Sequence, residues 1–247
     1  MRIYGKNTVI ERLRANPQSF RKIHIEHGFT DASEITKRAK KHNIPVMVVQ
    51  SSRMDRIARN KNMQGIVADV CDFEYADYDD LLKQCLEKNR CPVFLDSLQD
   101  PQNLGAIIRS LGCLGRFAII IPTHDSASVT ETVLKIACGG ENYVPIALVA
   151  NINKALRKAK DADFWIVGSV VEGGTNMDDF EWPHPIALVV GSERGGIRDV
   201  ILKNLDFQIT VPMYVDTMSL NAAQAATVIC YEIARHKRLH NKNLSKS

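Results

Sequence analysis

Short apolar runs alternate with amphipathic helical patterns from residue 92 onward, and this alternation limits the folds open to the chain. The runs are too short to span a membrane. Strands that alternate with helices in this way form mostly parallel sheets with helices on both faces, so we expect an α/β fold. The predicted strands cover residues 92–95, 117–121, 144–148, 164–169, 186–190 and 206–211. The predicted helices cover residues 103–113, 129–138, 151–160, 197–204 and 221–239.

The first 72 residues carry a second, smaller α/β pattern. Asn7 is suited to cap a first helix, and two further helices are predicted over residues 33–42 and 51–57. Strands are predicted over residues 23–25, 46–49 and 65–68. A segment of this length can form a small domain of its own. The sequence therefore predicts one domain over residues 1–72, a helical linker over 73–90 and a larger domain over 91–247.

Composition indicates a globular protein without membrane segments. Of the 247 residues, 45% are hydrophobic and 24% charged, and no apolar signal segment opens the chain. The six cysteines form no C-x-x-C pair and lie mostly in apolar segments. This pattern predicts reduced, buried thiols in a cytoplasmic protein without a metal site. The cysteines are Cys71, Cys85, Cys91, Cys113, Cys138 and Cys230.

The net charge of +4 is distributed unevenly. Residues 1–72 hold 14 Lys and Arg against 7 Asp and Glu, residues 73–234 hold 13 against 21, and residues 235–247 hold 5 against none. This asymmetry favours contact of both ends with a polyanion, although solvated basic faces explain it equally well. Candidate phosphate-binding residues form two clusters in the front module. The first contains Lys37, Arg38, Lys40 and Lys41, and the second contains Arg53, Arg56, Arg59 and Lys61.

A strand, turn and helix over residues 92–115 carry the first group of candidate functional residues. Pro101 sets the turn, and Asn103 is suited to cap the start of the helix. Arg109 has apolar neighbours, so its guanidinium either borders the apolar stripe or points into a site. Because Asn103 and Arg109 are nearly two turns apart, we expect them to project from similar sides of the helix.

Two later strand ends carry the other candidate residues. Residues 188–197 pass from a strand into a glycine turn around Glu193, where glycine allows a ligand to approach the backbone. Residues 211–221 lead into the last helix, where Ser219 is suited to cap the helix and Asn221 adds an amide. All three segments follow strands, at the edge where open α/β sheets bind ligands. We therefore expect one site, with a plain turn and an exposed Glu193 as the alternative.

The three segments resemble the motifs of the SpoU (TrmH-type) branch of the SPOUT RNA methyltransferases. The matching residues are 100–110, 191–193 and 212–221, in that order. The front module resembles the substrate-binding domain, with an L30e-like fold, that these enzymes often carry. The resemblance implies a parallel-sheet SPOUT domain with a C-terminal trefoil knot. It also implies S-adenosylmethionine as methyl donor, a ribose 2′-hydroxyl of structured RNA as acceptor, and a homodimer.

The same resemblance implies roles for individual residues. Arg109 is expected to grip an RNA phosphate and Asn103 to orient the ribose or Arg109. Glu193, Ser219 and Asn221 complete the expected catalytic group. Backbone around Gly191, Val211, Met213 and Leu220 is expected to hold the donor. The nearest branch methylates a guanosine of 23S ribosomal RNA.

The chain departs from the family pattern at Met63, Arg194, Val215 and Ala223. An RNA-binding protein with weakened catalysis is therefore one alternative. Within the enzyme class, the alternatives are a tRNA 2′-O-methyltransferase and an rRNA-methylating resistance enzyme. A nucleotide-dependent Rossmann enzyme is disfavoured, because no G-x-G-x-x-G follows a predicted strand.

The predicted last helix bears on assembly, because its apolar surface is broader than one sheet face needs. Small residues let helices approach closely, so a second chain would cover the excess. The alternative is that the helix is central in the core of a monomer. The residues concerned are Ala222, Ala223, Ala225, Ala226, Val228, Ile229, Ile233 and Ala234.

Overall fold

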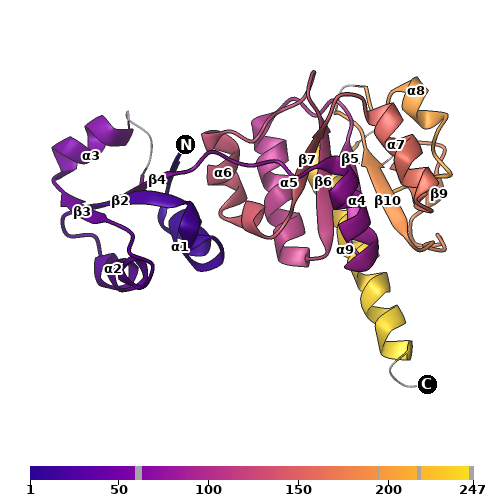
Figure 1. Cartoon of the computed structure of the whole chain (residues 1–247). Coiled ribbons are helices and arrows are strands. Elements are labelled where there is room, and N and C mark those ends of the chain that lie inside the picture. Colours follow the sequence, from indigo (N-terminus) through magenta and orange to yellow (C-terminus); the bar gives the residue numbers. More distant parts are fainter. Residues whose placement is uncertain (59–62, 194, 216–217, 245–247) are drawn as a thin grey trace.

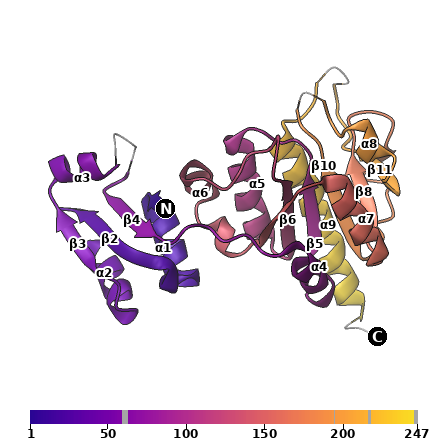
Figure 2. The ribbon, with the colours of Figure 1, turned by 45° about the horizontal axis from the view of Figure 1, so that its top comes forward.

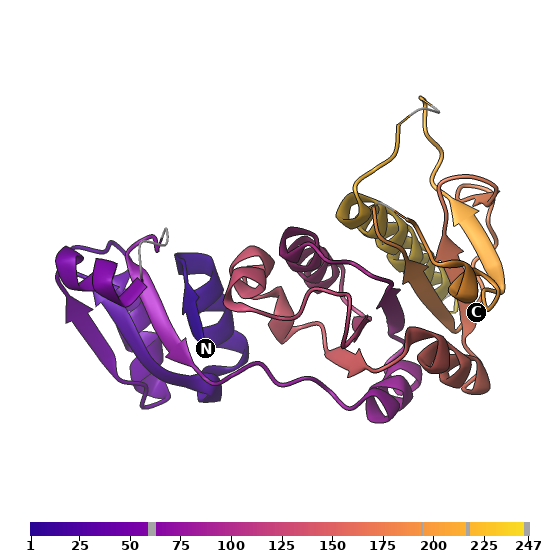
Figure 3. The same ribbon diagram turned by 90° about the horizontal axis from the view of Figure 1, so that it is seen from above.

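The structure is a computed structural model that describes residues 1–58, 63–193, 195–215 and 218–244 (Figure 1). An N-terminal module (residues 1–72) lies beside a larger body (residues 78–244), and each is built on its own sheet. In the view from above, the module is at one end of the molecule and α7 and α8 are at the other (Figure 3). In the described part of the chain, no helix combines the length and apolar character needed to cross a membrane.

The module contains a four-stranded sheet in the order β1-β4-β2-β3. Strand β4 runs antiparallel to β1 and β2, whereas β2 and β3 are parallel. The strands are β1 (Arg2–Tyr4), β2 (Phe20–Glu26), β3 (Val46–Val49) and β4 (Ile66–Val70). The helices are α1 (Lys6–Ala15), η1 (Pro17–Ser19), α2 (Ala32–Lys41) and α3 (Ser51–Ala58).

Side chains alternate across this sheet and thereby place the helices on both sides of it. Ile23 and Ile25 share a core with α1 and α2, whereas Val67 packs with Met54 of α3 on the other face. The expected cap at Asn7 is wrong, because α1 begins at Lys6 and no side chain caps it. Strand β1 was not predicted, since three residues are too few to show a period.

The body contains a seven-stranded sheet in the order β7-β6-β5-β10-β8-β11-β9. Every neighbouring pair is parallel, which confirms the fold class expected from the alternating pattern. The strands are β5 (Cys91–Leu95), β6 (Phe117–Pro122), β7 (Ile146–Val149), β8 (Trp165–Ser169), β9 (Thr175–Asn176), β10 (Ile186–Val190) and β11 (Phe207–Thr210). Only the two-residue β9 is absent from the predicted set.

Helices cover both faces of the large sheet (Figure 2). One face packs against α5 (Pro101–Leu114), α6 (Glu131–Ala137) and α9 (Ala222–Leu244). The other packs against α4 (Tyr78–Glu87), α7 (Ile152–Asp161) and α8 (Asp199–Leu202). Adjacent residues of β5 illustrate the division, because Val93 belongs to the first core and Phe94 to the second.

Most of the expected linker is in fact part of the body. Helix α4 lies within residues 73–90 and buries Leu81, Leu82 and Cys85 against the large sheet. The Tyr78 hydroxyl donates a hydrogen bond of 2.6 Å to the carbonyl of Ala155 in α7. The covalent link from the module to the body is therefore short, between the end of β4 at Val70 and the start of α4 at Tyr78.

The cysteines only partly follow the expectation of buried thiols. Cys85, Cys91 and Cys230 are buried, whereas Cys113 is exposed at the end of α5. Burial raises the pKa of the Cys91 thiol to about 11. The buried thiols are therefore protonated and unreactive near neutral pH.

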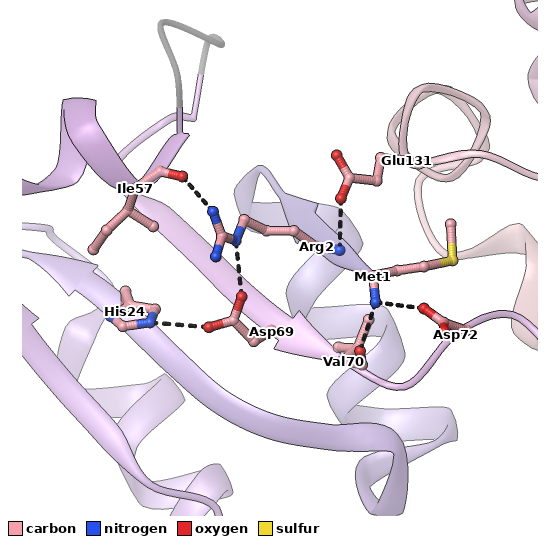
Figure 4. A network of polar contacts seen from close by, with 8 residues as sticks. All are labelled: Met1, Arg2, His24, Ile57, Asp69, Val70, Asp72 and Glu131. Carbon is pink, nitrogen blue, oxygen red and sulfur yellow. Dashed lines mark hydrogen bonds and ion pairs between the residues drawn. The ribbon is translucent and has the colours of Figure 1, made fainter.

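The module docks onto the body along α6 and the short helix η2 (Gly140–Asn142). The backbone amide of Arg2 donates a hydrogen bond of 2.9 Å to Glu131 at the start of α6 (Figure 4). Ile3 and Val9 belong to the same apolar cluster as Val133 of α6. Apolar packing therefore continues across the junction between the two sheets.

Candidate functional site

A cavity of about 770 Å³ opens at the carboxyl edge of the large sheet. Its walls are the segments that follow β8, β10 and β11, together with the start of α9. Because parallel strands end at the same edge, segments distant in the chain meet there. Two of the three expected strand ends, those of β10 and β11, line this cavity, and the segment after β8 takes the place expected for the one after β5.

Three of the predicted site residues form one hydrogen-bonded group beside this cavity. The Asn103 side-chain amide donates to Glu193 Oε1 in a short contact. Asn221 Nδ2 donates to Asn103 Oδ1 at 3.0 Å and lies 3.3 Å from the same Glu193 oxygen. One carboxylate thus joins α5, the β10 turn and the start of α9. We call these three residues the amide–carboxylate group.

Asn103 does not cap its helix, contrary to the prediction. Asp100 performs that role, because its side chain accepts a hydrogen bond of 2.8 Å from the Gln102 amide ahead of Pro101 at the first helical position. Asn103 is therefore free to turn inward toward Glu193, and it is only 6% exposed.

Ser219 does not cap the last helix either, because α9 begins three residues later, at Ala222. Asn221 takes the capping position, and its Oδ1 accepts a hydrogen bond of 2.9 Å from the amide of Ala223. The same side chain thus caps α9 with its oxygen and reaches Asn103 with its nitrogen. Ala223 takes part through its backbone, so this contact needs no side-chain hydroxyl at position 223.

The glycine turn after β10 is tightly closed. A Cβ added to Gly191 would lie only 2.1 Å from the carbonyl carbon of Gly196, so no larger residue fits. Ser192 and Gly196 exchange two backbone hydrogen bonds of 3.1 and 2.9 Å. This closure sets the direction in which Glu193 leaves the turn. Arg194 is outside the described residues.

An ion pair that was not predicted ties this turn to β5. Asp96 is fully buried and lies 2.6 Å from Arg198, whose backbone amide also donates to it at 3.1 Å. The signal was available in the sequence, because a lone Asp directly follows the apolar run 92–95 at the ligand-binding edge.

All of the residues expected to hold the donor line the cavity. Gly191, Val211, Met213 and Leu220 do so, as does Ser219. Sequence reasoning missed the segment after β8, which also lines it, although that segment follows a predicted strand at the same edge. The missed residues are Ser169, Val170, Val171 and Glu172, together with Gln208, Thr210 and Ile197.

The lining of the cavity suits a ligand with an apolar ring and a positive charge. Its walls combine aliphatic side chains with two carboxylates, Glu172 and Glu193, and its described lining residues include no Lys or Arg. A volume of this size can bury a nucleoside-sized molecule.

Arg109 lies apart from the amide–carboxylate group. Six residues turn through about 600° on an α-helix, which leaves two side chains about 120° apart. Asn103 therefore faces Glu193, whereas Arg109 is exposed on another side of α5. The expectation that the two residues project from similar sides is wrong, although the role expected of Arg109 stays a prediction.

The two predicted basic clusters lie on opposite faces of the module's sheet, so the structure does not unite them. Lys37, Lys40 and Lys41 are exposed on α2, where Arg38 pairs with Glu34 at 2.7 Å. Arg53 and Arg56 are exposed on α3, across the sheet (Figure 1). Arg59 and Lys61 lie outside the described residues.

The apolar surface of α9 is mostly used within the chain. Ala226 and Ile229 are fully buried against the body, and Val228 is 39% exposed. The width of the apolar surface is therefore explained mainly by the core and does not by itself require a second chain. The other buried members of the predicted set are Ala222, Ala223, Ile233 and Ala234.

Comparison with known proteins gives matches along most of the chain. The sequence model of the SpoU rRNA Methylase family matches residues 90–231, and that described as RNA 2′-O ribose methyltransferase substrate binding matches residues 2–76. A putative TrmH family tRNA/rRNA methyltransferase, YacO of Bacillus subtilis, is 34% identical over 238 residues, which are 95% of each chain.

Solved structures share the fold. The SpoU methyltransferase AviRb from Streptomyces viridochromogenes, solved with AdoMet, superposes with a TM-score of 0.76 at 21% identity, over 96% of this chain and 90% of that one. An AdoMet-bound rRNA methyltransferase from Sinorhizobium meliloti also gives a TM-score of 0.76, at 20% identity, over 95% of this chain and 87% of that one.

The hydrogen bonds of the amide–carboxylate group predict that substitutions at two neighbouring residues of α5 differ in their effect on the free energy of unfolding. Asn103→Ala removes two side-chain hydrogen bonds and leaves Glu193 with one amide donor fewer, so we expect a loss of about 1–3 kcal/mol in the free energy of unfolding. Gln102→Ala, at an exposed position, should change it by less than about 0.5 kcal/mol. Urea denaturation of both variants measures the difference, and equal losses would contradict the role given to Asn103.

Proposed function

The chain belongs to the SpoU methylase family of RNA methyltransferases, and from that premise we propose that it methylates a ribose 2′-hydroxyl of structured RNA with S-adenosylmethionine. The observation that supports this most directly is the amide–carboxylate group, which joins the three motif segments beside the cavity. Each segment contributes a residue that the family resemblance had marked.

The cavity fits the proposed donor. Apolar walls from Val211, Met213 and Leu220 can enclose an adenine ring, and the turn at Gly191 exposes backbone to the ligand. Glu172 and Glu193 give the described lining a negative character that favours a sulfonium ion. S-adenosylmethionine, when bound, supplies a methyl group on a positively charged sulfur. The chain's own residues then have to position the acceptor.

Acceptor positioning is the role that we propose for Arg109. A 2′-hydroxyl is a weak nucleophile, so its alignment and the removal of its proton govern the rate. A guanidinium can hold an RNA phosphate through two parallel hydrogen bonds, and it is too basic to act as a conventional general base. Glu193 has two amide partners, so we propose that it orients Asn103 and Asn221 at the cavity edge.

We further propose a homodimer in which Arg109 serves the cavity of the partner subunit. Within its own chain Arg109 is exposed and lies on a different side of α5 from Asn103. Helix α9 packs beside α5 and leaves Val228 and Tyr231 exposed, at 39% and 52%. These two residues give a second chain an apolar surface to cover.

The expected trefoil knot is part of the same proposal. The chain passes from β10, between β5 and β8, to β11 beyond β8, and then returns as α9 to pack on α5. A return of this kind across earlier segments is what a knot requires. Few proteins have one, since most chains do not thread their own loops.

Ribosomal RNA, with a guanosine of 23S RNA as target, is the substrate we propose. The support is the substrate-binding match over residues 2–76 and the likeness to the Sinorhizobium rRNA methyltransferase over both module and body. We place the RNA on the α1–α2 face of the module. A depression of about 390 Å³ there is lined by Arg14, Lys37, Arg38 and Lys41.

Methyl transfer itself tests the function. Purified protein should transfer labelled methyl groups to RNA from a strain lacking the gene, and mapping of 2′-O-methylation identifies the nucleotide.

Arg109→Ala should lower the rate at least about 100-fold, because a misplaced acceptor loses alignment, while calorimetry shows unchanged donor affinity. Arg157→Ala, on α7 at the opposite face, is the matched control. Near-normal turnover of the Arg109 variant would refute its role, and a modified tRNA would refute the ribosomal substrate.

Charge reversal tests whether RNA binds the α1–α2 face of the module or α3 on the other side of the sheet. Changing Lys37, Lys40 and Lys41 to Glu should weaken RNA binding and reduce the slope of log K against log salt by about 0.7–0.9 for each phosphate that the variant no longer binds. Changing Arg53 and Arg56 to Glu on α3 should have a smaller effect, because that face lies across the sheet. Reversal of Lys83, Lys88 and Lys154 on the body serves as control. If the α3 variant weakened RNA binding more than the α2 variant, the RNA-binding surface would be assigned to α3 instead.

Mixing two inactive chains tests the shared site. Arg109→Ala removes the acceptor group, and Leu220→Glu obstructs the donor cavity. If each site combines two subunits, random mixed dimers should recover about a quarter of wild-type activity, because half of the dimers contain one intact site.

The dimer itself is tested by Val228→Glu. In light scattering this variant should lower the particle mass from that of two chains toward that of one chain, 27.6 kDa. Full activity of a monomer would contradict the proposal. Ala226→Glu is a poor test, because Ala226 is fully buried within its own chain.

A further inference from the structure

A short turn links the N-terminal module to the helix that carries Arg109. This junction turn, residues 138–143, contains η2 and lies between α1 of the module and α5 of the body. It contains no residue of the amide–carboxylate group and does not line the donor cavity. Its contacts on both sides nevertheless bear on the proposed reaction.

On the body side, the turn packs directly on the backbone of α5. A Cβ added to Gly140 would lie 2.8 Å from the carbonyl oxygen of Ile108 and 3.0 Å from the Cα of Arg109. A Cβ added to Gly112, one turn further along α5, would lie 3.0 Å from the Cα of Gly140. The turn and the helix therefore touch where neither has room for a side chain. A shift of the turn toward α5 would therefore displace the helix at Arg109 itself.

On the module side, the turn packs equally closely on α1. Gly139 has a φ of +94°, and a Cβ placed there would lie 2.5 Å from the Cβ of Glu11. The Tyr143 hydroxyl donates a hydrogen bond of 3.1 Å to the carboxylate of Glu11. The turn is thus held between two helices, one from each part of the molecule.

A buried ion pair anchors this contact. Arg12 of α1 and Glu141 of the turn are only 3% and 7% exposed, and their nearest charged atoms are 3.9 Å apart. Arg12 Nε donates to Ser19 Oγ at 2.9 Å, and Asn142 Nδ2 donates to Glu141 at 3.2 Å. Burial raises the pKa of Glu141 and lowers that of Arg12. A pair that is costly to bury and fully enclosed is better suited to fixing one arrangement than to adding stability.

We infer that the junction turn is a positioning element, which sets the place of Arg109 relative to the RNA-binding module through the Arg12–Glu141 pair. RNA held by the module then meets α5 at a constant distance and angle, so its ribose arrives aligned with Arg109. The inference rests on the proposed RNA methylation. Arg12, Glu141 and Gly140 are positioning residues, since none touches donor or acceptor.

Other contacts keep the module attached when this pair is broken. The Arg2 amide still bonds to Glu131 (Figure 4). The apolar cluster still joins α1 to α6. We therefore expect Arg12→Gln and Glu141→Gln to fold with the module still attached to the body. The module should, however, lose its fixed orientation relative to the body.

The test compares Arg12→Gln, Glu141→Gln and the double variant with two exposed controls, Glu87→Gln and Arg157→Gln. Each single variant should lower kcat at saturating RNA by about tenfold or more, because small misplacements of reacting groups are costly. Donor affinity by calorimetry should stay within twofold of wild type. The double variant should recover much of kcat, because it leaves no unpaired buried charge. If the pair had a purely structural role, its loss would lower the donor affinity and the free energy of unfolding together. The kcat of the enzyme that remains folded would then stay at the wild-type value.

A distance measurement tests the inference without relying on activity. Spin labels at the exposed Cys113 of α5 and at Ser52→Cys of α3, with Cys71 and Cys138 changed to Ser, report the orientation of the module. The distance distribution should broaden in both single variants and narrow again in the double variant. If wild-type protein methylates no RNA, the proposed function fails, whereas an unchanged distribution overturns the positioning role alone.

Gly140→Ala covers the case in which a charge variant fails to fold. The added methyl group presses on α5 at Ile108 and Arg109, which do not line the donor cavity. We expect kcat to fall about tenfold with unchanged affinity for donor and RNA. Wild-type kcat in folded Gly140→Ala protein would overturn the inference.

Discussion

The carboxylate of Glu193 is the group on which the proposed active site depends. It accepts amide hydrogen bonds from Asn103 and Asn221, residues 90 and 28 positions away in the chain. Glu193 is itself exposed at the rim of the cavity, and the two amides that reach its Oε1 come from different helices. Sharing that oxygen links α5, the turn after β10 and the start of α9. The three motifs become one site because they share a single acceptor.

The parallel sheet makes this meeting possible. Its strands end at one edge, and the fully buried Asp96 ties β5 to Arg198 beyond the glycine turn. Gly191 closes the turn so tightly that Glu193 has one way to leave it. The cavity that we propose for the donor therefore lies at the sheet edge, whereas the proposed positioning of the acceptor falls to α5. The proposed division of labour follows from these two locations.

Much of this architecture follows from the sequence alone. The alternation of apolar runs and helical patterns predicts the parallel sheet, and six of its seven strands appear where the pattern placed them. The three polar segments lie at the strand ends, so their shared edge is also predictable. These features depend on local periodicity and on the common direction of parallel strands, which need no knowledge of distant contacts.

Only the tertiary structure decided which way individual side chains point. Asp100 and Asn221 cap their helices in place of Asn103 and Ser219, because each cap depends on where the helix starts. Helix α4 belongs to the body, although the sequence predicted it as part of a linker, because its apolar face packs against the large sheet. The Arg12–Glu141 pair joins a helix of the module to a turn of the body, and no local pattern marks it. The sequence thus determined the elements and their order, while contacts between distant residues decided the orientation of the side chains, because burial and charge pairing act through space and not along the chain.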